Sequence, residues 1–156
     1  MNGYLMDTNH VVAWEAQNPL LLAKVKSLPK DTLLCTSAIT LGEMSAGHEM
    51  TSGDPQRRHQ VNQFLNIYVI PYAVAVTDAT RSYYGQIIGR IWRRQPPANA
   101  SVSTDAHLLS LGVDINDVWI VACAWEHGLT LLTTDSMANI RAVTVTAEVN
   151  FDNWLI

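Results

Sequence analysis

Residues 129–135 read Leu-Thr-Leu-Leu-Thr-Thr-Asp, a short apolar run that stops at an aspartate. A second run of this kind, Leu5-Met6-Asp7, lies near the start of the chain. Apolar residues at consecutive positions, rather than at every second one, are typical of parallel strands that are buried on both faces. We therefore predict two parallel strands that carry Asp7 and Asp135 at the same edge of a sheet.

The remaining segments alternate between short apolar runs and helical patterns. Further strands are expected at 33–36, 72–76 and 143–145. Helices are expected at 9–16, 19–28, 38–50, 61–68, 84–91 and 115–127, with Pro19 at a first position and with Ser37 and Asp114 as caps. Alternating strands and helices predict an α/β protein, a three-layer α/β/α sandwich with a central parallel sheet. Ligands of such sheets bind beyond the carboxyl ends of the strands.

Composition limits the class of protein. The chain has 156 residues, of which 48% are hydrophobic and 15% are charged, so we expect one folded domain over 1–156 and not a disordered linker. A formal net charge of −4 argues against nucleic-acid binding through bulk positive charge, although a local basic groove remains compatible with it. Two isolated cysteines and the absence of a leader-like or membrane-spanning pattern predict a cytoplasmic protein without a membrane segment.

Two further carboxylates stand out from their surroundings. Asp117 lies in the first turn of the apolar helix predicted at 115–127. Glu43 shares one helical face with Ile39, Ala46 and Met50. We expect this face to be buried, and a buried carboxylate is costly unless a partner neutralises it. The three lysines lie together between 24 and 30 and the arginines lie in other helices, so no cation is the evident partner.

Each acid taken alone has a structural explanation. Asp7 could cap the helix that follows it, Asp117 could be a capping-box acid, and Asp135 could cap a helix after its turn. Four acids at one sheet edge, however, would repel one another and raise each other's pKa values. A hard divalent cation, Mg²⁺ or Mn²⁺, prefers oxygen ligands and would relieve this repulsion. Such a site is suited to cleaving a phosphodiester.

Four blocks of sequence, in this order, resemble a known family. They are Leu-Met-Asp7-Thr8-Asn9, Ser-Ala-Ile-Thr-Leu-Gly-Glu43, Asn116-Asp117-Val-Trp-Ile-Val-Ala and Gly-Leu-Thr-Leu-Leu-Thr133-Thr134-Asp135. Together they are similar to PIN-domain nucleases, and more narrowly to the VapC-type toxins of bacterial toxin–antitoxin pairs. The segment around Glu43 resembles the FitB-like branch. The resemblance extends from Tyr4 to about Val145.

The resemblance implies a PIN-like α/β/α fold and a Mg²⁺- or Mn²⁺-dependent endoribonuclease that hydrolyses RNA with a metal-activated water. The catalytic and metal-binding residues would be Asp7, Glu43, Asp117 and Asp135, the last of them directly or through water. The supporting residues would be Asn9, Asn116 and Thr133. The resemblance also implies a homodimer and a VapB-like antitoxin that inserts into the acidic groove, with DNA contacted only through that antitoxin.

Three other features are interpreted structurally. The five histidines have no zinc-site spacing, so we expect them on the surface or in a groove. Arg90, Arg93 and Arg94 end a predicted helix, and we interpret them as cations that complement its C-terminus. The stretch 94–112 is long and polar and departs from the commonest VapC-type toxins, which bears on the shape of the substrate groove near Asp117.

Competing functions differ in how well they fit. Haloacid-dehalogenase phosphatases and response-regulator receivers need a late lysine, but no lysine follows Lys30. Nucleotide-binding Rossmann and P-loop proteins are excluded, because no two glycines lie two apart and no Gly-Lys occurs. The serious alternative is a non-catalytic PIN-like protein that binds a DNA-binding antitoxin and acts in operon repression.

Overall fold

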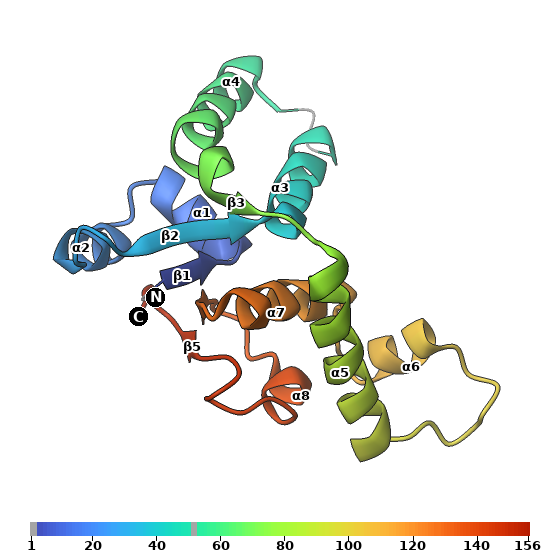
Figure 1. The fold of residues 1–156 in the computed structure, drawn as a ribbon. Helices are drawn as coiled ribbons and strands as arrows, with labels where there is room; N and C mark the ends of the chain where they lie inside the picture. Colours follow the sequence, from blue (N-terminus) through green and yellow to red (C-terminus); the bar gives the residue numbers. More distant parts are fainter. Residues whose placement is uncertain (1–2, 51–52) are drawn as a thin grey trace.

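The computed structural model describes residues 3–50 and 53–156. Its centre is a five-stranded sheet in the order β3-β2-β1-β4-β5 (Figure 1). The strands are β1 (Gly3–Met6), β2 (Leu33–Ser37), β3 (Ala73–Val74), β4 (Thr130–Leu132) and β5 (Phe151–Asp152). Every neighbouring pair is parallel, which confirms the predicted parallel sheet.

The strand order reverses at the centre of the sheet. From β1 the chain builds β2 and β3 on one side, and later it adds β4 and β5 on the other. In the register of β1 and β4, Met6 lies opposite Leu132. The carboxyl ends of these two strands are therefore level with each other at the point of reversal, where open α/β sheets bind ligands.

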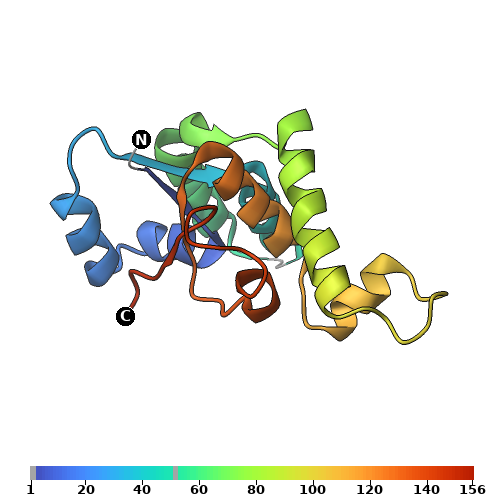
Figure 2. The same cartoon turned by 60° about the horizontal axis from the view of Figure 1, so that its bottom comes forward.

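Helices cover both faces of the sheet. They are α1 (Thr8–Glu15), α2 (Pro19–Ser27), α3 (Ala38–Met50), α4 (Pro55–Phe64), α5 (Asp78–Arg94), α6 (Thr104–Ser110), α7 (Ile115–His127) and α8 (Ala138–Arg141). A π-helical turn (Leu65–Val69) and a 3₁₀ turn (Ile70–Tyr72) connect α4 to β3. Figure 2 shows α5 alongside α7, with α6 and the loop before it projecting beyond the end of α5.

Two apolar cores separate the three layers. Leu5 and Leu131 face one core, which contains buried residues of α5 and α7. Met6 and Leu132 face the other, which contains residues of α1, α2 and α4. Successive side chains of a strand point to opposite faces, so consecutive apolar residues fill both cores. This arrangement confirms the predicted α/β/α sandwich.

Helix starts follow the predicted capping chemistry. Pro19 begins α2, where its missing N–H costs no hydrogen bond. The Thr40 backbone N–H donates to Ser37 Oγ over 3.0 Å at the start of α3. At the start of α7, the Asn116 backbone N–H donates to Asp114 Oδ1 over 2.7 Å. These caps fix where α3 and α7, the helices that carry Glu43 and Asp117, begin.

The last strand differs from the prediction. Residues 143–145 form no strand, and Phe151–Asp152 completes the sheet beside β4 instead. The guanidinium of Arg90 donates to the Val143 carbonyl over 2.9 Å and pairs with Glu148. Arg94 donates to the Ala142 carbonyl over 3.2 Å. These two arginines thus bind the segment after α8, and Arg90 occupies a backbone carbonyl of the predicted strand.

Helix α6 lies within the polar stretch 94–112. The Ala106 backbone N–H donates to Ser103 Oγ at its start. In the described residues, no single helix is long and apolar enough to cross a membrane. Helices α6 and α7 reach that threshold of length and hydropathy only as a pair, and they are bent by 94° relative to each other.

The prediction of surface or groove positions is wrong for two histidines. His10 is completely buried, and its Nε2 accepts a hydrogen bond from the Trp154 backbone N–H over 3.2 Å. His107 is also buried, with Nε2 2.6 Å from the Gln95 carbonyl oxygen. Burial lowers the pKa of His10 below its usual value. The neutral ring of His10 therefore holds the C-terminal segment against the sheet.

We expect this contact to make stability sensitive to acid. Because the folded-state pKa of His10 is lowered, the unfolded chain binds a proton first as the pH falls below about 6.5, and the free energy of unfolding then decreases. His10→Gln keeps an acceptor but does not titrate. In urea unfolding, the free energy of unfolding of the variant should be about 1 kcal/mol lower than that of the parent at pH 8. Between pH 6.5 and 5 it should decrease less than that of the parent.

His59→Gln is the matched control, because His59 is exposed on α4. It should keep the pH dependence of the parent. Identical pH profiles for His10→Gln and the parent would contradict the role of His10.

Candidate metal centre

Asp7 joins β1 to β4 and to α1. Its backbone N–H continues the ladder of β1 with a 3.0 Å hydrogen bond to the Leu132 carbonyl. Its Oδ1 accepts from the Thr8 backbone N–H over 2.6 Å and caps α1, while its Oδ2 accepts from Thr133 Oγ1 over 2.8 Å. The residue is only 3% exposed, and burial raises its pKa despite these hydrogen bonds. Asp7 is thus both a helix cap and a buried carboxylate.

Glu43 lies at the edge of the protein interior. The predicted buried face of its helix is wrong beyond this residue, because Ala46 is exposed and Met50 is 80% exposed. The half-buried carboxylate accepts from Thr8 Oγ1 over 2.5 Å and from Asn116 Nδ2 over 2.9 Å. Two neutral donors therefore stabilise Glu43 in place of a cation.

Asp117 shows that the acids converge. Its pKa is raised to about 7, first by burial and then by the negative charges of its acidic neighbours. These neighbours are Asp114, Asp7, Asp135 and Glu43. The structure therefore brings all four predicted acids into one electrostatic cluster, together with Asp114, which caps α7.

Asp135 is the only exposed residue among the four predicted acids. Its backbone N–H donates to Thr133 Oγ1 over 3.1 Å, so this one hydroxyl group contacts both Asp135 and Asp7. The alternative role of Asp135 as a helix cap is wrong, because the N-cap of α8 is Met137 and no side chain caps that helix. The position of Asp135 therefore depends on Thr133 and not on α8.

The predicted supporting residues occupy different places. Thr133 and Asn116 each bind an acid, as described above. Asn9 instead donates from Nδ2 to Thr134 Oγ1 over 2.8 Å and so ties α1 to the end of β4. Thr8, whose hydroxyl group binds Glu43, was not among the predicted supporting residues. The only signal for Thr8 was its position directly after Asp7.

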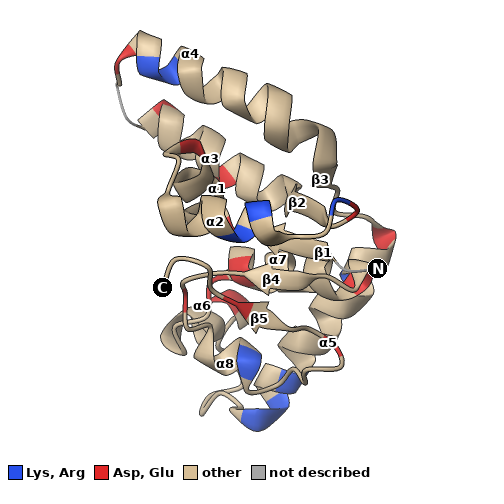
Figure 3. Ribbon diagram, turned by 90° about the vertical axis from the view of Figure 1, so that its left-hand side faces the viewer, with Lys and Arg blue, Asp and Glu red and all other residues tan. Residues whose placement is uncertain are grey.

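Within residues 3–50 and 53–156, no ion pair neutralises these acids. The Arg/Lys ion pairs found there are Arg57–Glu15, Arg58–Glu49 and Arg90–Glu148. Figure 3 shows acidic segments gathered beside α7 and β4, whereas basic segments lie on α2, on α4 and around α5 and α8. The expectation that Glu43 lacks a cationic partner holds for the described chain.

The donor chemistry of the cluster fits a hard divalent cation. Every ionisable member is a carboxylate, and oxygen ligands are those that Mg²⁺ and Mn²⁺ prefer. As the side chains lie, however, no three His, Cys, Asp or Glu residues among those described form a group that could hold an ion. The Asp7 and Glu43 carboxylates instead point toward hydroxyl and amide donors.

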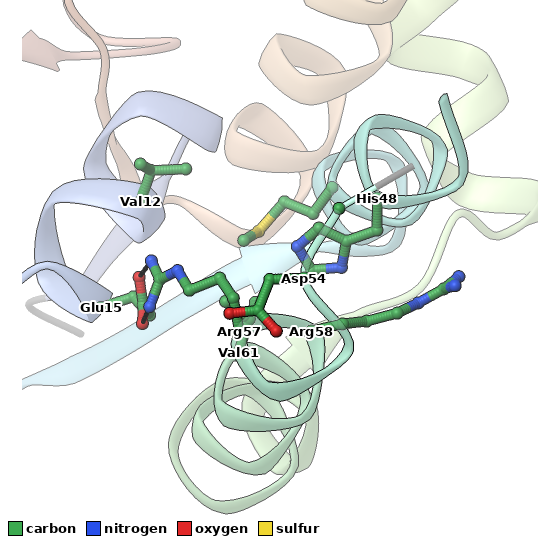
Figure 4. Close-up of a pocket in the computed structure, with 9 residues that line it drawn as sticks. Val12, Glu15, His48, Asp54, Arg57, Arg58 and Val61 are labelled. Carbon is green, nitrogen blue, oxygen red and sulfur yellow. Dashed lines mark hydrogen bonds and ion pairs between the residues drawn. The ribbon is translucent and has the colours of Figure 1, made fainter. Parts of the chain in front are cut away.

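Two pockets lie near the helices that carry the acids. The first, here the α8 pocket, has about 400 Å³ and includes Asp117 and Asp135 in its lining. The second, here the α4 pocket, has about 230 Å³ and lies between α1, α3 and α4 (Figure 4). Its lining residues include Val12, Met44, Val61 and Arg57. Arg57 extends to the Glu15 carboxylate and is already paired there.

Comparison with known proteins identifies the family of this chain. A PIN domain profile covers residues 4–143. This chain belongs to the PIN-domain family. A comparison with curated protein sequences finds no significant match.

Solved structures share the fold of this PIN domain. DNA-bound VapBC from Salmonella typhimurium is 18% identical, with a TM-score of 0.69 over 99% of both chains. VapBC2 from Rickettsia felis, bound to a promoter fragment, is 19% identical, with a TM-score of 0.67 over 97% of this chain and 98% of the other. FitAcB from Neisseria gonorrhoeae is 22% identical, with a TM-score of 0.65 over 97% of both chains.

Burial of the Asp117 carboxyl, together with the negative charges around it, predicts that one substitution stabilises the metal-free protein. Since the pKa of Asp117 is raised to about 7, its ionised form destabilises the fold above pH 7, and this cost declines as the pH falls toward 4. Asp117→Asn mimics the neutral form. Urea unfolding with a chelator should show a gain of about 2 kcal/mol at pH 8 and a smaller gain at pH 5.

Asp31→Asn provides the control, because this exposed acid lies before β2, at the opposite edge of the sheet. It should leave stability nearly unchanged at both pH values. A gain for Asp117→Asn that does not vary with pH would contradict the electrostatic explanation.

Proposed function

We propose that this PIN domain is a Mg²⁺- or Mn²⁺-dependent endoribonuclease and the toxin component of a type II toxin–antitoxin pair. One observation carries the proposal: Asp117 lies within electrostatic range of Asp7, Glu43 and Asp135 in a PIN fold, and none of these four carboxylates forms an ion pair with Lys or Arg in the described chain. A structural salt-bridge network would place arginine or lysine among them. A cation-binding site needs this surplus of negative charge.

The cation would be held by carboxylates from four elements. Asp7, Glu43 and Asp117 would be its main ligands, and Asp135 would complete the site directly or through water. A bound Mg²⁺ or Mn²⁺ would neutralise phosphate charge and lower the pKa of a water molecule that attacks phosphorus. Because the Asp117 carboxyl favours its proton in the metal-free protein, cation and proton would compete for it, and cation binding would strengthen as the pH rises through about 7.

The neutral residues would position these ligands. Thr133 binds Asp7 through its hydroxyl group, and Thr8 and Asn116 hold the two oxygens of Glu43. Such hydrogen bonds fix the orientation of a carboxylate without neutralising it. These neutral donors therefore leave the negative charge of the site available to a cation.

RNA as the substrate is supported by the resemblance of the four sequence blocks to VapC-type toxins. The acid cluster would repel a phosphate backbone in the absence of a cation, since like charges repel each other. We therefore propose that cleavage depends strictly on the divalent ion. In the proposed reaction, water would attack phosphorus and the 3′ oxygen would be the leaving group.

A partner protein is part of the proposal. Two of the solved structures compared above are named VapBC and VapBC2 and are bound to DNA, and the third is named FitAcB. We propose that this chain binds a VapB-like antitoxin in the cytoplasm, contacts DNA only through it and forms a homodimer. The antitoxin would silence the enzyme by inserting into the acidic groove.

One observation favours the alternative of a non-catalytic binding protein that acts in operon repression. In the described chain the Glu43 carboxylate is hydrogen-bonded to Thr8 and Asn116, and no three of the acids form a ready group of metal ligands. A protein that only binds its antitoxin would keep its function when an acid is neutralised. A single variant that lacks one acid therefore distinguishes the nuclease from the binding protein.

Asp7→Asn should abolish cleavage while the fold is kept. The amide oxygen still accepts from the Thr8 N–H, but one negative charge is lost from the site. We expect cleavage of structured RNA with Mg²⁺ or Mn²⁺ to fall by about 100-fold or more. Chelation of the metal should stop cleavage by the parent protein.

Asp31→Asn, with the same loss of charge at the opposite edge of the sheet, should cleave like the parent. Co-purification with an antitoxin should survive in Asp7→Asn. Equal cleavage by Asp7→Asn and the parent would overturn the catalytic proposal, and retained antitoxin binding without any cleavage by the parent would favour the alternative.

A further inference from the structure

The α8 pocket adjoins the acid cluster on the side of α7 and α8. It has about 400 Å³, a size typical of pockets for small ligands. Two short segments line it together with the acids, namely 111–113 before α7 and 136–140 at the start of α8. A group bound in this pocket would therefore lie directly beside Asp117 and Asp135.

Asn139 fixes the shape of this pocket. Its Nδ2 donates to the Leu111 carbonyl over 2.7 Å, and its Oδ1 accepts from Gln95 Nε2 over 2.6 Å. These bonds tie α8 to the segment before α7 and to the end of α5. Both lining segments also turn through left-handed residues, Gly112 with φ of 69° and Met137 with φ of 43°. Such a conformation is costly for Met137 and is retained where the surrounding structure demands it.

The charges around the pocket determine which part of a nucleotide can enter it. All ten residues that line it belong to the described chain. Two of them are acids, and none is Lys or Arg. A phosphate group would be repelled there and would have no cation to bind. An uncharged group can enter, since Leu111, Val113 and Met137 offer apolar surface and the backbone and Ser136 offer polar groups.

A nucleobase has this combination of properties. It is flat, uncharged, apolar on its faces and polar along its edges, and a methionine sulfur makes favourable contacts with aromatic rings. A base within a duplex presents neither face, so only an unpaired base could enter the pocket. The phosphate attached to that nucleotide would then lie at the acid cluster, where the proposed cation neutralises it.

We propose that the α8 pocket binds the base of one unpaired nucleotide next to the scissile phosphate, and so restricts cleavage to RNA in which that base is extruded. This inference rests on the proposed nuclease function and adds the feature that selects the substrate. Met137 would pack against the base, Ser136 would contact its polar edge, and Asn139 would act as a positioning residue for the pocket wall.

Ala138 provides the test. It is exposed at the first position of α8 and lines the pocket, so Ala138→Trp should fill the pocket without altering the hydrogen bonds of Asn139. Ala142→Trp is the matched control, since Ala142 is exposed at the other end of the same short helix and does not line the pocket. Both variants should bind Mn²⁺ like the parent in calorimetry.

The first measurement is independent of cleavage and does not require a variant. Adenosine, guanosine, cytidine and uridine are titrated in turn into the ¹⁵N-labelled parent protein with a chelator present. At least one of them should shift the amide resonances of Gly112, Ser136 and Asn139. Ala142→Trp should show the same shifts, and Ala138→Trp should not.

The second measurement compares Mn²⁺-dependent cleavage of an RNA hairpin and of a fully paired duplex. The parent and Ala142→Trp should prefer the hairpin loop, and Ala138→Trp should cleave it at least about 10-fold more slowly. The base pocket is overturned if the parent cleaves RNA but no nucleoside shifts the pocket amides. It is also overturned if Ala138→Trp cleaves the hairpin as fast as the parent. Both results leave the nuclease proposal standing. Nucleoside binding in the pocket without any RNA cleavage supports the pocket and overturns the nuclease proposal.

Discussion

Mutual repulsion among carboxylates at one sheet edge is the constraint on which the rest of this structure depends. Burial and four acidic neighbours raise the pKa of Asp117 to about 7, and Asp7 is more deeply buried still. The fold tolerates this repulsion because Thr133, Thr8 and Asn116 give the carboxylates hydrogen bonds. Hydrogen bonds of this kind stabilise charge locally but do not remove it, so the surplus negative charge remains as the main chemical property of the site.

The pairing of β1 with β4 creates the site. Met6 lies opposite Leu132, so the next residues, Asp7 and Thr133, lie side by side and form their 2.8 Å hydrogen bond. The strand order reverses at this pair, and α1 and α3 begin nearby, directly after β1 and β2. Side chains from segments more than 120 residues apart in the chain therefore meet without any long loop to position them.

Local patterns predicted the parts of the site that local chemistry controls. Consecutive apolar residues before Asp7 and Asp135 indicated parallel strands, and Ser37 and Asp114 cap helices as expected. Contacts between distant segments were beyond such patterns. Val143-Thr144-Val145 has the composition of a strand, but Arg90 binds the Val143 carbonyl. The burial of His10 depends on Trp154, and the α8 pocket depends on contacts of Asn139 with Leu111 and Gln95, none of which leaves a periodic signal.

Anomalous diffraction from crystals grown with Mn²⁺ tests the proposed metal site most directly, because it locates the ion without reference to activity. We expect a peak between the carboxylates of Asp7 and Asp117, within ligand distance of both, with Glu43 and Asp135 turned toward it. A map at saturating Mn²⁺ with no peak there, or with its strongest peak at acids elsewhere on the molecule, would contradict it.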